Sequence, residues 1–306
     1  MPAQHQAARP WQIPSSGRWW TRLLLVLVVL AGLVALGWWI LGSSSPAVHD
    51  QGVLGPSSRT SEGRTPGITG HLSNTTSTTT TKPPAALAGK VIVIDPGHNG
   101  GNFQNPSFIN QTIWNGRENE TCDTTGTATD SGYTEAQFNF NVALAVQSDL
   151  QAEGATVILT RDSNTGVGPC VTQRTAIGNN AHAAAALSIH ADGGPADGRG
   201  FAILEPVADG PNDNVIASSD ALGLDLRNAF AAGTGMPVST YDGVDGLQPR
   251  DDLAGVNLTT VPKVFIECGN MRNETDAALL TNSAWQQQAA AAIAQGLTTF
   301  VESSSQ

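Results

Sequence analysis

Four ionisable side chains, far apart in the sequence, have the types that a hydrolytic metal site requires: His98, Glu135, His190 and Glu267. Two neutral imidazoles and a carboxylate form a ligand set suited to zinc, and they leave a fourth position for a water molecule. The metal lowers the pKa of that water toward neutrality and polarises a substrate carbonyl. A second carboxylate, outside the ligand set, can then move the proton to the leaving group. The residue types therefore predict a metal-dependent hydrolase, with Glu267 as the candidate proton carrier.

Three of these side chains stand at the ends of predicted β-strands. The β-branched run Val91–Ile94 stops at Asp95–Gly97, so His98 lies on a tight turn just past a strand. Two further apolar runs, Ala185–His190 and Lys263–Glu267, each end on a candidate residue. Parallel strands joined through helices bring their C-terminal ends to one edge of a sheet, where ligands bind. We therefore expect the three side chains to meet at that edge. A structural turn that happens to contain a histidine is the alternative for His98.

Glu135 opens a predicted helix. Thr134 and Gln137 form a capping box, apolar residues follow at helical spacing, and Gly154 ends the element. Glu135 falls in the first turn, with Asn139 one turn later on the same face. A carboxylate near a helix N-terminus is favoured electrostatically, so a purely structural role is the alternative for Glu135.

The remaining segments alternate between strand and helix patterns. This alternation predicts an α/β fold, a single domain with a mostly parallel central sheet flanked by helices. The further elements are expected as strands at Ala155–Thr160 and Gly200–Glu205, helices at Val171–Ala183, Asn214–Ala232, Thr275–Leu280 and Trp285–Val301, and an irregular stretch at Met236–Thr260.

The first 86 residues differ in character from the rest. Residues 1–22 are polar, with three arginines and no acidic residue, and we expect a cytoplasmic tail. Residues 23–42 carry no charge, and 20 helical residues span about 30 Å, the thickness of a bilayer core. Tryptophans flank both ends and arginines precede the span, which predicts a transmembrane signal anchor. Residues 43–86 are rich in Ser, Thr, Gly and Pro, which is typical of a disordered linker.

This organisation predicts a single-pass protein of the cell membrane whose catalytic domain, residues 87–302, lies outside the cytoplasm. A cleaved signal peptide, and hence a secreted protein, ranks second. The apolar stretch exceeds the usual ~7–15 residues of a signal peptide, and no clear cleavage site follows it. The net charge of −11, with 15 lysines and arginines, gives no electrostatic basis for binding nucleic acid.

The three cysteines, Cys122, Cys170 and Cys268, have no spacing typical of a zinc knuckle or a redox motif. An odd number in an exported chain indicates one disulfide and one thiol. Cys268 lies in an apolar strand, where a buried thiol is ordinary, so we expect a Cys122–Cys170 disulfide. It would anchor a polar insertion, Asn102–Ser131, beside the site. The insertion is either a flap over the site or a plain surface excursion.

Five motifs occur in an order that resembles the zinc-dependent N-acetylmuramoyl-L-alanine amidases of the amidase-3 type. The resemblance covers about Lys90–Phe300, which is essentially the whole predicted domain. The motifs are VIVIDPGH ending at His98, E-x-x-x-N at Glu135 and Asn139, TRD at Thr160–Asp162, SIHAD at Ser188–Asp192, and VFIECGNMRN from Val264 followed by DAALL.

The resemblance implies one zinc ion per chain, with His98, Glu135 and His190 as its ligands. It implies that Glu267 is the catalytic carboxylate, acting as general base and then as general acid. The bond cleaved would be the amide between the lactyl group of N-acetylmuramic acid and L-alanine of the peptidoglycan stem peptide, in cell-wall remodelling. We expect a monomer that acts on peptidoglycan or muropeptides.

Two residues of the last motif, Asn270 and Cys268, differ from what is usual in the family or lie next to the catalytic carboxylate. Family members more often carry an aromatic residue where Asn270 stands, so substrate fit could differ. Cys268 follows the catalytic Glu267, but neighbouring strand residues face opposite sides, so its thiol should point away from the metal. Two other functions stay open from the sequence: a zinc peptidase acting on the stem peptide, and a non-catalytic cell-wall-binding protein.

Overall fold

The computed structural model describes residues 85–305 of the chain. The predicted tail at 1–22, the predicted transmembrane segment at 23–42 and nearly all of the predicted linker at 43–86 lie outside that range. Within residues 85–305, no helix combines the length and the apolar character that crossing a bilayer requires.

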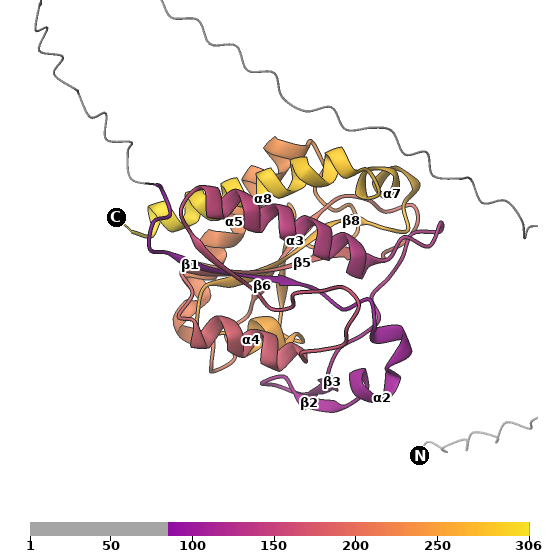
Figure 1. The fold of residues 1–306 in the computed structure, drawn as a ribbon, viewed down its shortest axis with the longest axis horizontal. Coiled ribbons are helices and arrows are strands. Elements are labelled where there is room, and N and C mark those ends of the chain that lie inside the picture. The colour runs from indigo at the N-terminus through magenta and orange to yellow at the C-terminus, as the bar shows by residue number, and fades with distance from the viewer. Residues whose placement is uncertain (1–84, 306) are drawn as a thin grey trace, which may run out of the picture. The chain divides into compact units, whose positions relative to one another are not determined.

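A six-stranded sheet forms the centre of the domain (Figure 1), with the strand order β4-β1-β5-β8-β6-β7. The pairs β1–β4, β1–β5, β5–β8 and β6–β7 are parallel, and only β6–β8 is antiparallel. The predicted mostly parallel sheet is thus confirmed. The strands are β1 (Val91–Pro96), β4 (Thr156–Leu159), β5 (Ala185–Asp192), β6 (Ala202–Pro206), β7 (Leu247–Arg250) and β8 (Lys263–Asn270).

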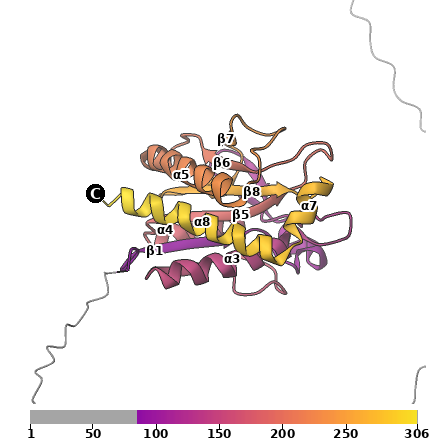
Figure 2. The same ribbon diagram turned by 90° about the horizontal axis from the view of Figure 1, so that it is seen from above.

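Helices cover both faces of this sheet (Figure 1). On one face, α8 (Ser283–Ser303) lies between α3 (Glu135–Ala152) and α5 (Ile216–Thr234), as Figure 2 shows from above. On the other face lie α4 (Val171–Asn180) and α6 (Ala254–Asn257). The short helix α7 (Glu274–Leu280) follows β8, and the one-turn helix η2 (Asp213–Val215) precedes α5.

Strand alternation divides the core into two layers. Ile92 and Ile94 of β1 belong to the large cluster under α3, α5 and α8, whereas Val93 belongs to a smaller cluster on the α4 face. Successive strand residues point to opposite faces, so an uninterrupted apolar run fits a strand covered on both sides. The same alternation buries Cys268 in the large cluster, on the opposite face of β8 from Glu267, as predicted.

The segment Met236–Thr260 is more regular than predicted, because it contains β7 and α6. The prediction of an irregular stretch was wrong for these two elements. β7 reads LQPR, and its proline and polar residues give no apolar run; such a strand is tolerated at the sheet edge, where β7 lies. α6 has four residues, which is too short for a helical repeat to be visible.

The insertion after β1 is ordered in four short elements: η1 (Asn102–Gln104), α2 (Pro106–Ile109), β2 (Thr112–Trp114) and β3 (Asn119–Thr121). A disulfide joins Cys122 to Cys170, 48 residues further on, so the predicted pairing is confirmed. Cys268 is a buried free thiol, also as predicted. Closing a loop of this length contributes on the order of 4 kcal/mol in the chain-entropy model. The cross-link fixes the end of the insertion to the start of α4.

Candidate active site

The side chains of His98, Glu135 and His190 converge at one edge of the sheet. Nε2 of His98 lies 3.2 Å from Oε2 of Glu135, and Nδ1 of His190 lies 2.9 Å from Oε1 of the same carboxylate. One nitrogen or oxygen from each residue lies within 4.8 Å of the others. The predicted convergence of these three residues is therefore present in the fold.

The backbone explains how the two histidines meet. β1 and β5 are parallel neighbours, with Pro96 paired to Ile189, so the residues that follow both leave the sheet at the same edge. The amide of Gly97 donates to the carbonyl of Ile189 over 3.0 Å and ties the turn to β5. His98 has φ of 57°, a left-handed conformation that is uncommon outside glycine and that clusters at functional sites. The turn therefore holds the His98 ring against β5.

Glu135 reaches the histidines from the first turn of α3. Thr134 caps the helix by accepting from the amide of Gln137, which is one half of the predicted capping box. The Gln137 side chain bonds to Asn141 and Asn164 instead of returning to the Thr134 amide. The Glu135 carboxylate is buried and also accepts from the amide of Thr127 over 2.9 Å. Asn139, one turn later, donates to Glu135 over 3.4 Å and to the carbonyl of Gly97 over 3.2 Å. The E-x-x-x-N spacing thus joins the carboxylate to the His98 turn.

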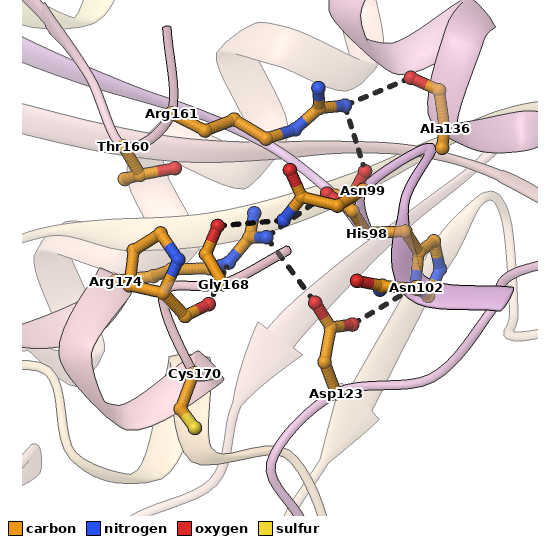
Figure 3. Close-up of polar contacts among 12 residues, drawn as sticks. His98, Asn99, Asn102, Asp123, Ala136, Thr160, Arg161, Gly168, Cys170 and Arg174 are labelled. Carbon is orange, nitrogen blue, oxygen red and sulfur yellow. Dashed lines mark hydrogen bonds and ion pairs between the residues drawn. The ribbon is translucent and has the colours of Figure 1, made fainter. Parts of the chain in front are cut away.

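Arg161 of the TRD motif, two residues after the end of β4, holds the same turn. Its Nε donates to the carbonyl of Pro96 over 2.8 Å, and its Nη2 donates to the carbonyl of Gly97 over 3.2 Å. Nη2 also donates to the carbonyl of Ala136 over 2.8 Å (Figure 3). One buried guanidinium therefore links the turn after β1 to the first turn of α3. The TRD motif includes Arg161 but does not indicate that it links these two turns. Its partners are backbone carbonyls, which leave no signal in the sequence.

Glu267 stands beside the three residues on the neighbouring strand. β5 and β8 pair in parallel, and the register sets Glu267 opposite His190. Its Oε2 atom is buried and has no hydrogen-bond partner among residues 85–305. Burial raises the pKa of Glu267 well above the usual range, and the neighbouring carboxylates of Glu135 and Asp192 raise it further. The group is thus suited to carrying a proton.

The four candidate residues line one cavity of about 320 Å³. The end of the insertion supplies part of its wall through Thr124, Gly126 and Thr127, so this part of the insertion is not a remote surface excursion. The other lining residues are Asp192, Gly193, Leu204, Arg250, Leu253 and Phe265. The Phe265 ring stacks on His190, with 5.4 Å between ring centroids.

The charges around the two imidazoles favour a cation between them. Burial lowers the pKa of His98, but the carboxylates of Glu135 and Asp123 outweigh it and raise that pKa to about 10. Burial raises the pKa of Glu135, but the neighbouring His98 and His190 bring it well below the usual range. Two imidazole nitrogens and a carboxylate at these distances also form the borderline-soft donor set of zinc. The residues therefore fit a divalent cation, and a site of this kind is typical of metal-dependent hydrolases.

Two other polar residues lie outside this cluster. His182 is exposed in the turn after α4. Asn270 is buried, and its amide donates to the carbonyls of Pro195 over 2.7 Å and Gly198 over 2.8 Å. The departure at Asn270 therefore shapes the loop after β5 rather than adding a side chain to the cavity wall.

Comparisons with known proteins agree with this site. A family model described as N-acetylmuramoyl-L-alanine amidase matches residues 92–299. The N-acetylmuramoyl-L-alanine amidase Rv3717 of Mycobacterium tuberculosis is 37% identical over 226 residues, which are 73% of this chain and 91% of that protein. The chain belongs to this family of amidases.

Solved structures show the same similarity. The amidase Ami1 of Mycobacterium smegmatis is 39% identical, with a TM-score of 0.67 over 71% of this chain and 99% of that one. The apo form of Ami1 from Mycobacterium abscessus is 38% identical, with a TM-score of 0.66 over 70% and 99% of the two chains. The protein is thus an enzyme, an N-acetylmuramoyl-L-alanine amidase that acts on peptidoglycan.

Gly97 has no side chain, and the His190 ring packs directly against it. A substitution at Gly97 therefore tests the position of that ring. A Cβ at this position would lie 2.1 Å from Cε1 and 2.2 Å from Nε2 of His190, so the ring would have to move. We expect Gly97→Ala to weaken zinc binding by about 10-fold or more, as a displaced ligand does. Gly166→Ala, where a Cβ would meet its nearest atom at 3.8 Å, is the matched control. Zinc titration of both variants measures this, and wild-type affinity in Gly97→Ala would contradict the packing described.

Proposed function

We propose that the enzyme is a zinc-dependent amidase in which His98, Glu135 and His190 hold one zinc ion per chain and Glu267 transfers protons. The bond hydrolysed is the amide between the lactyl group of N-acetylmuramic acid and L-alanine of the stem peptide. The observation that carries the proposal is the convergence of the three donor atoms within 4.8 Å, with a carboxylate opposite His190 that none of them engages. Membership of the amidase family supports the choice of bond.

The zinc ion, when bound, lowers the pKa of a water molecule toward neutrality and polarises the carbonyl of the scissile amide. Glu267 accepts the proton that the attacking water loses, and it returns a proton to the nitrogen of the departing L-alanine. A buried carboxyl whose pKa burial has raised can hold that proton between the two steps. The free Oε2 atom leaves the group available for both transfers.

Neighbouring polar groups hold the Glu135 carboxylate in place and balance part of the negative charge of the site. Asn139 and the amide of Thr127 hold the Glu135 carboxylate, so it keeps its place between the two imidazoles. Arg250 lines the cavity and forms a two-point ion pair with Asp252 over 2.7 Å for each contact. We assign Arg250 to the cavity rim, where its positive charge offsets part of the acidic surroundings of Glu267.

Product analysis tests the choice of bond. N-acetylmuramoyl-L-alanyl-D-isoglutamine incubated with the protein and zinc should give N-acetylmuramic acid and a free dipeptide with L-alanine at its N-terminus, identified by mass. The same incubation with a chelator should give neither product. Cleavage within the peptide would instead identify a peptidase and overturn the proposed bond. An uncleaved substrate, with zinc bound, would overturn the mechanism.

We further propose that the enzyme works outside the cytoplasm in cell-wall remodelling, as a monomer. Residues 1–22 form its cytoplasmic tail, 23–42 its membrane anchor and 43–86 a linker to the catalytic domain at 87–302. The Cys122–Cys170 disulfide supports this location, because disulfides persist in oxidising compartments. A chain secreted after cleavage of residues 23–42 is the alternative, and the size of the mature protein in membrane and medium fractions distinguishes the two.

A further inference from the structure

Asp123, at the end of the insertion, is a buried carboxylate that the sequence did not single out. Its Oδ1 atom lies 3.2 Å from Nδ1 of His98 (Figure 3). The other ring nitrogen, Nε2, faces Glu135. The same Oδ1 accepts from the amide of Thr124 over 2.7 Å. The carbonyl of Thr124 also lies 3.2 Å from Nδ1 of His98. The ring nitrogen that faces away from the candidate metal position thus lies beside two oxygens that can only accept, and the Thr124 hydroxyl, 3.3 Å from the same nitrogen, can accept as well.

Arg174 of α4 holds Asp123 and the His98 turn together. Its Nη2 lies 3.3 Å from Oδ2 of Asp123 and donates to the carbonyl of His98 over 3.0 Å. Its Nη1 donates to Asp95 over 3.0 Å and to the carbonyl of Pro96 over 2.8 Å. The Arg174 side chain is 2% exposed, so these partners replace the water that the guanidinium has lost.

The disulfide fixes the backbone on which this arrangement depends. Cys122 precedes Asp123, and its partner Cys170 caps the N-terminus of α4, the helix that carries Arg174. The amide of Val171 donates to the carbonyl of Cys122 over 2.9 Å. Asp123 and Arg174 are therefore held in register by a covalent bond and a backbone hydrogen bond. Neither segment can move without disturbing the other.

We propose that Asp123 is a positioning residue for the metal site, acting through His98. It accepts the Nδ1 proton of His98, which leaves the lone pair of Nε2 directed at Glu135 and His190. The hydrogen bond made by one ring nitrogen sets which nitrogen binds the metal, and carboxylates in this position raise the basicity of the ligand. The inference rests on the proposed role of His98 as a ligand. It adds a residue from the insertion to a site whose proposed ligands come from the turn after β1, from α3 and from β5.

Zinc affinity tests this role directly. The full chain, purified in detergent, is titrated with zinc in competition with a chromophoric chelator, for wild type, Asp123→Asn and Asp130→Asn. Asp123→Asn keeps the side-chain volume but cannot accept from His98 and from Arg174 at once, and we expect about 10-fold weaker binding or more. Asp130→Asn removes the same charge from an exposed aspartate of the same insertion that pairs with Arg272, and we expect an affinity within twofold of wild type.

A second measurement does not depend on any variant. Nitrogen-15 NMR of the zinc-loaded wild type should show His98 with a proton on Nδ1 and no proton on Nε2. A proton on Nε2 with zinc on Nδ1 would overturn the inference, as would an Asp123→Asn variant that is folded and binds zinc within twofold of wild type. If wild type itself binds no zinc, the proposed function falls together with this inference. If wild type binds zinc and only the Asp123 result fails, the proposed function stands.

Discussion

Glu135→Gln is expected to abolish zinc binding and to lower amide hydrolysis by at least about 10³-fold. The carboxylate lies between the two imidazoles, at 3.2 Å from His98 and 2.9 Å from His190, so it is the central donor of the cluster. Glutamine has the same shape, but it has no charge, and its NH₂ group would face one of the imidazoles. A metal ion stabilises the transition state by several kcal/mol, and each 1.4 kcal/mol corresponds to about a tenfold rate change.

The matched control for this prediction is Glu274→Gln. Glu274 is also an acidic residue in the first turn of a helix, α7, but it is exposed and lies outside the cavity. We expect this variant to bind zinc and to hydrolyse substrate as wild type does. Metal content by elemental analysis and initial rates on a defined muropeptide measure both effects. A Glu135→Gln variant that keeps one zinc per chain would contradict the ligand assignment.

Glu267→Gln is expected to lower kcat by about 10²–10⁴-fold while leaving zinc bound, because general acid–base catalysis contributes a factor of that size. The variant keeps the volume of the side chain and removes only its ability to take up and return a proton. Its Oε2 atom makes no hydrogen bond within residues 85–305, so no buried donor loses its partner there. The effect should therefore fall on the rate and not on the stability of the fold.

Glu205→Gln serves as the control for this second variant. Glu205 is a buried carboxylate on β6, the strand next to β8, and burial raises its pKa to about 7, but it does not line the cavity. We expect Glu205→Gln to change kcat by less than a few-fold. Steady-state rates and zinc content of the two variants separate a catalytic carboxylate from a buried one. If Glu267→Gln hydrolysed substrate at a rate near that of wild type, Glu267 would not be the proton carrier.

The sequence could predict that His98, Glu135, His190 and Glu267 belong to one site because each has a local signature. His98, His190 and Glu267 each follow or end a β-branched run, and a parallel sheet brings such ends together. Glu135 directly follows the N-cap residue Thr134, which fixes where α3 begins. The pattern of strand ends thus indicates the site, and the order of the motifs indicates the family.

What the sequence could not predict depends on contacts between distant segments. Asp123 meets His98 only because Arg174 and a disulfide bring the insertion against α4, and nothing near residue 123 signals a partner at 98 or 174. Arg161 binds backbone carbonyls, which every residue carries. β7 was missed because an edge strand needs no apolar alternation. Local sequence patterns predict helices and strands. The residues that hold the site residues in place can be identified only from the tertiary contacts of the folded domain.

Anomalous scattering at the zinc edge, from crystals of the zinc-loaded protein, tests the central claim most directly. The account predicts one peak per chain, within about 2.0–2.2 Å of Nε2 of His98, a carboxylate oxygen of Glu135 and Nδ1 of His190. A peak located elsewhere, or no peak in protein that hydrolyses the muramoyl–alanine amide at full rate, would contradict it.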